Sequence, residues 1–102
     1  MLMEVLPDDI VSVVHSEKDV TVIMSNGKRF FNEMSYYSAL RIMDENFLRI
    51  NKSTIVNLTY VTRINKNILY MANDENYEIE KEYLNDTMNL FYKLKLRKFQ
   101  EN

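Results

Sequence analysis

The stretch FLRINKSTIVN, residues 47–57, gathers polar side chains at the junction between two apolar runs. It contains two cations, Arg49 and Lys52, beside the hydroxyl groups of Ser53 and Thr54. These side chains donate and accept hydrogen bonds, and the Ile-Val pair that follows them would anchor the stretch to an apolar core. The stretch is therefore either a polar surface turn or a surface that reads a polar partner.

The charges of the chain are segregated along the sequence, although the net charge is only -2. Residues 46–73 and 88–100 contain no acidic residue, while acids are densest in residues 74–82. Segregation of sign is an argument about partners rather than about fold. The basic residues of the two acid-free stretches are Arg49, Lys52, Arg63, Lys66, Lys93, Lys95, Arg97 and Lys98.

The composition argues against an enzyme and against a cofactor. Without cysteine the chain forms no disulfide and no thiolate metal site. Its only histidine, His15, has no partner at metal-ligand spacing, and a single glycine excludes a glycine-rich phosphate loop. We therefore expect no cofactor, no metal and no small-molecule substrate. The chain also has neither a run of membrane-spanning length nor a signal-like start, so we expect a cytoplasmic protein.

The length of 102 residues predicts one domain, over residues 1–102, built mostly from strands. β-Branched and aromatic runs bounded by turn residues mark the strands. Asn26-Gly27 predicts a tight hairpin turn in which both residues have positive φ. The expected strands are 10–14, 19–24, 29–31, 47–50, 54–57, 60–64, 68–72 and 77–80.

Helical spacing of apolar residues occurs twice. The first occurrence predicts a short helix capped by Ser35, and the second predicts a helix at the end of the chain. The fold class is therefore mainly β, with one short inserted helix and a C-terminal helix. The apolar positions are Tyr36, Ala39, Leu40, Met43 and Phe47 in the first helix, and Leu84, Met88, Phe91 and Leu94 or Lys95 in the second.

The stretch MDENFLRINKSTIVNLTYVTRI, residues 43–64, resembles the LytTR family, the DNA-binding domain of many bacterial response regulators. The match extends from about residue 8 to about residue 98. The resemblance implies an elongated stack of antiparallel β-sheets that reads DNA with loops rather than with a recognition helix. The residues that carry the central motif are Phe47, Arg49, Asn51, Lys52, Ser53, Ile55, Val56 and Asn57.

The resemblance also implies three DNA-contacting regions. They are the first hairpin around Lys18, the position of Lys52 with its neighbours, and the entry into the last helix around Lys81. Amide, hydroxyl and ammonium groups suit base edges in the major groove. Further cations, such as Lys66 and the basic tail near the C-terminus (Lys93, Lys95, Arg97 and Lys98), would neutralise phosphates. The expected DNA-contacting residues are Lys18, Arg49, Asn51, Lys52, Ser53, Lys66, Lys81 and Glu82.

Two features leave alternatives open. Ser53 and Asn57 have a purely structural interpretation, in which their side chains only satisfy backbone groups of a turn. Glu80 and Glu82 stand where the family usually has serine and basic residues, so two carboxylates would face a polyanion.

The expected function is that of a sequence-specific regulator of transcription that binds double-stranded DNA. It would lack a receiver domain and would act as two copies on repeated promoter half-sites. The alternative is an interaction module of the same fold that has lost DNA binding and modulates another regulator or a membrane partner. The acidic stretch 74–82 favours this alternative, and the acid-free stretch 46–73 opposes it. A fragment of a longer response regulator is a further alternative.

Overall fold

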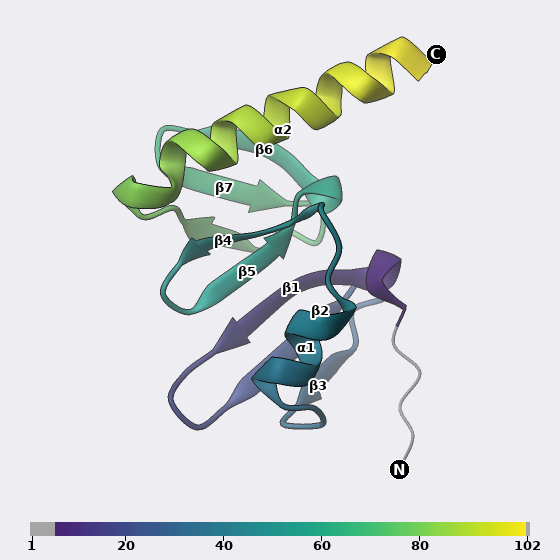
Figure 1. Cartoon of the computed structure of the whole chain (residues 1–102), viewed down its shortest axis with the longest axis vertical. Helices are drawn as coiled ribbons and strands as arrows, with labels where there is room; N and C mark the ends of the chain where they lie inside the picture. The colour runs from purple at the N-terminus through teal and green to yellow at the C-terminus, as the bar shows by residue number, and fades with distance from the viewer. Residues whose placement is uncertain (1–5, 102) are drawn as a thin grey trace.

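A computed structural model describes residues 6–101, with side chains described for residues 6–97. The chain forms eight strands and two α-helices over this range (Figure 1). In chain order the elements are η1 (Pro7–Asp9), β1 (Ile10–His15), β2 (Val20–Met24), β3 (Arg29–Phe31), α1 (Tyr36–Ile42), β4 (Phe47–Asn51), β5 (Thr54–Asn57), η2 (Leu58–Tyr60), β6 (Val61–Asn65), β7 (Ile68–Met71), β8 (Asn76–Glu78) and α2 (Lys81–Glu101).

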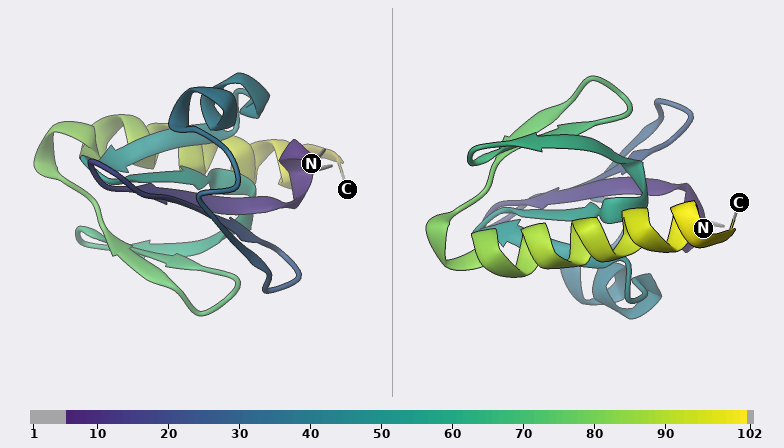
Figure 2. Two further views of the ribbon diagram at one scale, coloured as in Figure 1. Left: turned by 90° about the horizontal axis from the view of Figure 1, so that it is seen from below. Right: turned by 90° about the horizontal axis from the view of Figure 1, so that it is seen from above.

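The strands form two antiparallel sheets, so the predicted fold class is confirmed. The larger sheet has the order β3-β2-β1-β5-β4, and the smaller sheet has the order β6-β7-β8. Helix α1 covers one face of the larger sheet, and the smaller sheet lies on the other side (Figure 2). Helix α2 packs against β4 and η2. The molecule is elongated, with extents of 41 × 32 × 23 Å.

Two apolar clusters form the core, one on each face of the larger sheet. The main cluster joins Val11 and Val56 of this sheet to Leu69 of the smaller sheet and to Phe91 of α2. The second cluster joins Ile10, Val13 and other side chains of the larger sheet to α1. Strand β1 is therefore buried on both faces, which explains why its sequence is an almost continuous β-branched run.

Helix α1 is shorter than the apolar spacing predicts. Ser35 caps it as expected, since its Oγ accepts a hydrogen bond from the backbone N–H of Ser38. The helix ends at Ile42, however, and Phe47 belongs to β4. Leu40 falls on the predicted apolar face, but 41 % of it is exposed. In so short a helix the fully buried Ala39 packs in the cluster with the larger sheet, whereas Leu40, the next residue, stays outside that cluster and partly exposed.

The turn between β2 and β3 also differs from the prediction. Gly27 has a φ of 89°, whereas Asn26 is not among the residues with positive φ. Asn26 instead accepts a hydrogen bond from the backbone N–H of Lys28 through its side chain. The loop is longer than a two-residue turn, since the N–H of Met24 donates to the carbonyl of Lys28, so only one position needs glycine.

Candidate nucleic-acid interface

Four turns lie side by side along one edge of the molecule, on the left in Figure 1. The backbone N–H of His15, at the end of β1, donates to the carbonyl of Ser53 in the β4–β5 turn at 2.7 Å. The N–H of Lys52 in that turn donates to the carboxylate of Glu80 at 2.6 Å. The carbonyl of Asn67 in the β6–β7 turn accepts from Ile79 at 2.7 Å. We call residues 16–19, 51–53, 65–67 and 80–82 the turn edge, and we count the entry into α2, residues 80–82, as its fourth turn.

Each of the four turns presents one lysine. Lys18, Lys52, Lys66 and Lys81 are all exposed. Among the described side chains none of these four lysines forms an ion pair. All three regions implied by the family resemblance, and Lys66 as well, therefore come together on one edge although up to 63 residues separate them in sequence (Lys81 minus Lys18).

The acidic residues of the turn edge are partly engaged within the protein. The carboxylate of Asp19 accepts from the side-chain amide of Asn32 at 2.9 Å, and that of Glu80 accepts from Lys52. Glu80 therefore directs its carboxylate toward the protein, in contrast to the expectation that it faces a polyanion. Glu17 and Glu82 are exposed and have no such partner among the described residues.

The backbone of the Lys52-Ser53 turn is completely hydrogen-bonded by the protein. Besides the two bonds that involve Glu80 and His15, the N–H of Ser53 donates to the side chain of Asn51 at 2.9 Å. The carbonyl of Lys52 accepts from the guanidinium of Arg49 at 3.4 Å. The turn is thus held in one conformation, and only its two side chains remain for a partner.

The side chain of Ser53 is exposed, and its Oγ makes no hydrogen bond among the described residues. A purely structural role for this hydroxyl therefore has no support. Asn57 behaves in the opposite way. Its side chain is buried, donates to the carbonyl of Ile10 at 3.0 Å and accepts from the N–H of Thr59 at 3.0 Å. The structural interpretation of Asn57 is thus confirmed.

Asn51 and Arg49, both expected at the interface, support the turn from behind. The Asn51 amide donates to the carbonyl of Glu78 at 2.8 Å while its oxygen holds Ser53. Arg49 is half-buried and donates to the hydroxyl of Tyr36. Their polar atoms are therefore already bonded to other groups of the protein.

Arg49 lies in a cluster with two rings. The rings of His15 and Tyr36 are 4.1 Å apart between centroids, and the Arg49 guanidinium lies 3.5 Å from Nε2 of His15. Burial, and next the charge of Arg49, lower the pKa of His15 below 6.5, although a backbone hydrogen bond to Ser16 acts in the other direction. His15 thus accepts a proton less readily beside a cation.

Sequence reasoning missed the supporting roles of His15, Tyr36 and Glu80. Each lies on a different element, β1, α1 and the segment before α2. They meet only because the sheet order places β1 beside β5 and because α2 begins next to the β4–β5 turn. No local sequence motif predicts that residues from these three elements lie around the same turn.

A family model for the LytTR DNA-binding domain matches residues 2–91 of the chain. The chain belongs to the LytTR family. The LytTR DNA-binding domain of a putative methyl-accepting/DNA response regulator from Bacillus cereus has a similar structure, with a TM-score of 0.72. The two are 18 % identical, and the match covers 86 % of this chain and 85 % of the other, so this likeness concerns the fold. Among curated proteins none matches the chain.

The basic tail of this LytTR domain does not share the turn edge. From Lys81 to Arg97 the helix rises by about 24 Å, at about 1.5 Å per residue. Arg97 pairs with Glu45 at 3.8 Å, and the ammonium of Lys95 lies 4.8 Å from the centre of the Phe91 ring. The tail cations therefore lie at the opposite end of α2 from the four exposed lysines (Figure 1).

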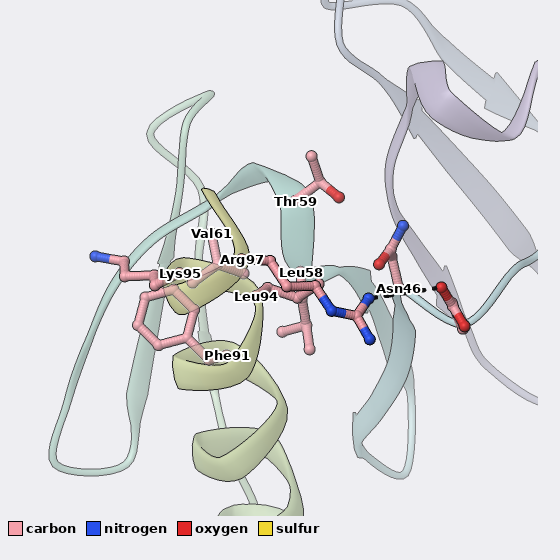
Figure 3. Close-up of a pocket in the computed structure, with 9 residues that line it drawn as sticks. Asn46, Leu58, Thr59, Val61, Phe91, Leu94, Lys95 and Arg97 are labelled. Carbon is pink, nitrogen blue, oxygen red and sulfur yellow. Dashed lines mark ion pairs between the residues drawn. The ribbon is translucent and has the colours of Figure 1, made fainter. Parts of the chain in front are cut away.

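A groove of about 290 Å³ lies at this opposite end, between α2 and the segment around η2. Phe91 and Leu94 of α2 line it together with Leu58 and Val61 (Figure 3). Within the described part of the LytTR domain, no group of three or more His, Cys, Asp or Glu residues could hold a metal ion. None of the described helices is long and apolar enough to cross a membrane.

Proposed function

We propose that this LytTR domain is a sequence-specific regulator of transcription that reads double-stranded DNA with its turn edge. The observation that carries the proposal is the convergence of four exposed lysines, none of them in an ion pair among the described side chains, around a turn whose backbone is already fixed. A pre-ordered turn binds without a further cost of ordering its backbone.

The turn edge divides the work of binding between two kinds of contact. Lys52 and Ser53 project from the fixed turn and supply donors and an acceptor for base edges in the major groove. Lys18, Lys66 and Lys81 stand on the neighbouring turns and contact phosphates, the part of the affinity that depends on salt and not on sequence. Asn51 and Arg49 act behind the turn, as their hydrogen bonds indicate.

The shape of the molecule suits a contact along the duplex. The four turns are spread along the longest axis, which is vertical in Figure 1 and measures 41 Å. One turn of B-DNA rises by about 34 Å, so a molecule of this length reaches along about one helical turn of the duplex. Two copies of the domain would then occupy repeated half-sites in a promoter and meet as a dimer on DNA. The domain acts in the cytoplasm, where promoter DNA lies, and carries out no catalysis.

A selection from a library of random duplexes tests the proposal, because the selection itself supplies the preferred sequence. Fluorescence anisotropy then compares the selected duplex with a shuffled duplex of the same composition. We expect preferential binding of the selected duplex, and binding to both duplexes that weakens as salt is raised. Equal affinity for both duplexes would contradict sequence-specific reading.

The alternative function, an interaction module that modulates another regulator or a membrane partner, makes a different prediction. Such a module would show no binding to any selected duplex at moderate salt. The exposed acids Glu17 and Glu82 on the turn edge would then serve a contact with a protein.

A further inference from the structure

We propose that Glu80 is a positioning residue: its carboxylate holds the Lys52-Ser53 turn in the conformation that reads DNA. The inference rests on the proposed function for its consequence in DNA binding. It reverses the role that the charge of Glu80 alone suggests, because a carboxylate close to DNA would otherwise only repel phosphates.

The backbone fixes the position of Glu80 next to the turn. Its N–H donates to the carbonyl of Ile50 at 2.8 Å, and its own carbonyl accepts from the N–H of Tyr83 at 2.9 Å. Glu80 thus stands directly before the first residue of α2, in the place where capping side chains usually bond the helix. Its side chain instead reaches the N–H of Lys52 at 2.6 Å.

The hydrogen bond from Lys52 to Glu80 differs from the other three that hold the turn. The other partners are an amide oxygen, a guanidinium and a backbone N–H, and only Glu80 offers a charged acceptor to a turn N–H. Charge-assisted hydrogen bonds are shorter and stronger than neutral ones. The other charged partner, Arg49, lies 3.4 Å from the Lys52 carbonyl, whereas Glu80 lies 2.6 Å from the Lys52 N–H. Glu80 also ties the second contact region to the third, so that Lys52 and Lys81 keep a fixed relative position.

Substitutions at Glu80 distinguish a carboxylate that only repels DNA from one that holds the Lys52-Ser53 turn. Glu80→Ala removes the acceptor and the charge, whereas Glu80→Gln removes the charge and keeps an oxygen that accepts from Lys52. If Glu80 only repels DNA, both changes strengthen binding alike. If Glu80 holds the turn, the alanine variant loses affinity for the selected duplex and the glutamine variant keeps or gains affinity.

The experiment combines amide hydrogen exchange at Lys52, measured by NMR without DNA, with anisotropy on the selected and shuffled duplexes. We expect faster exchange of the Lys52 amide in Glu80→Ala and an affinity for the selected duplex that falls by about tenfold, as the population of the competent turn falls. Asp86→Ala is the control, because Asp86 is exposed on α2 outside the turn edge and bonds no turn group among the described residues. It should leave the exchange of Lys52 unchanged and should not weaken binding.

The outcomes are distinguishable. Unchanged Lys52 exchange in Glu80→Ala, or binding by this variant as tight as that of the parent, would overturn the proposal. If Glu80→Ala does not fold, Glu80→Met removes the acceptor while keeping the length of the side chain, and the same criteria apply. If the parent binds no duplex, the proposed function fails, and the exchange rate alone decides whether Glu80 holds the turn.

Discussion

Ser12 of β1 and Tyr77 of β8 are 65 residues apart in sequence, and their hydroxyl groups form a hydrogen bond of 2.9 Å that joins the two sheets. Ser12 is fully buried, whereas Tyr77 is half-buried. Burial raises the pKa of the Tyr77 hydroxyl above 10.0, so this group stays protonated at neutral pH and remains able to donate to Ser12. The polar bridge thus fixes the smaller sheet against the centre of the larger one.

Removal of this bridge should destabilise the domain. Tyr77→Phe leaves the buried hydroxyl of Ser12 without its partner, which costs about 1–3 kcal/mol in free energy of unfolding. Urea unfolding followed by circular dichroism measures the loss. Tyr92→Phe is the control, because Tyr92 is 54 % exposed, and it should change the stability by less than about 0.5 kcal/mol. Equal stability of both variants would show that the bridge contributes nothing.

Stability should fall as the pH is lowered through the range in which His15 titrates. The folded state lowers the pKa of His15 below 6.5, so as the pH falls His15 is protonated more readily in the unfolded chain than in the folded chain. Proton uptake then favours the unfolded state. The urea midpoint should therefore decrease between about pH 7.5 and about pH 5.5, a window above most carboxylate pKa values. His15→Gln should flatten this dependence. An NMR titration of the His15 ring that gave a pKa above 6.5 would contradict this prediction.

Lys52→Ala should weaken binding to the selected duplex. If Lys52 reaches a base edge, the loss is about 1–3 kcal/mol and is concentrated on the selected sequence. If it contacts only phosphate, selected and shuffled duplexes weaken alike and the salt dependence becomes shallower. Lys93→Ala, on an exposed position of α2 away from the turn edge, is the control and should bind like the parent. Identical behaviour of both variants would mean that the turn does not read DNA.

Glu82→Arg should strengthen DNA binding. Glu82 is exposed on the first turn of α2, beside Lys81. Its replacement removes repulsion and adds attraction to phosphates, for a gain of about 1–3 kcal/mol that shrinks with salt. The variant should also lose about 0.3–1 kcal/mol of stability, because an acid near a helix N-terminus is favourable.

The matched control for this variant is Asp86→Arg, the same charge reversal one helical turn farther along α2. Asp86 is also exposed but lies about 6 Å farther from the start of the helix. Anisotropy on the selected duplex at two salt concentrations compares the two variants, and the control should gain less affinity. Equal gains at both positions would point to a general effect of net charge rather than to a contact at the turn edge.

The strands could be predicted because their signals are local. The eight β-branched or aromatic runs all form strands, and the family motif places Lys52 in a turn. The end of α1 could not be fixed from the sequence, because Phe47 both keeps helical spacing with Met43 and begins the predicted strand 47–50; its backbone pairs with Asn57 of β5. Tertiary pairing outweighs the local pattern there.

The turn edge could be predicted only in part, for the same reason. The sequence identifies residues that could contact DNA, but not the direction in which their polar atoms point. Asn51 looks like a reading residue by its type, and only the position of Glu78 reveals that its amide is used within the protein. Glu80 looks like an unfavourable charge, and only the neighbouring Lys52 backbone reveals its acceptor role.

An NMR titration of the domain with a selected duplex decides whether the turn edge is the surface that meets DNA. We expect the amide signals of residues 16–19, 51–53, 65–67 and 80–82 to shift together as the duplex is added. Signals around Lys93 and Arg97, at the other end of α2, should remain in place. Shifts confined to that basic end of α2, or no shifts at all, would show that the turn edge is not the DNA-binding surface.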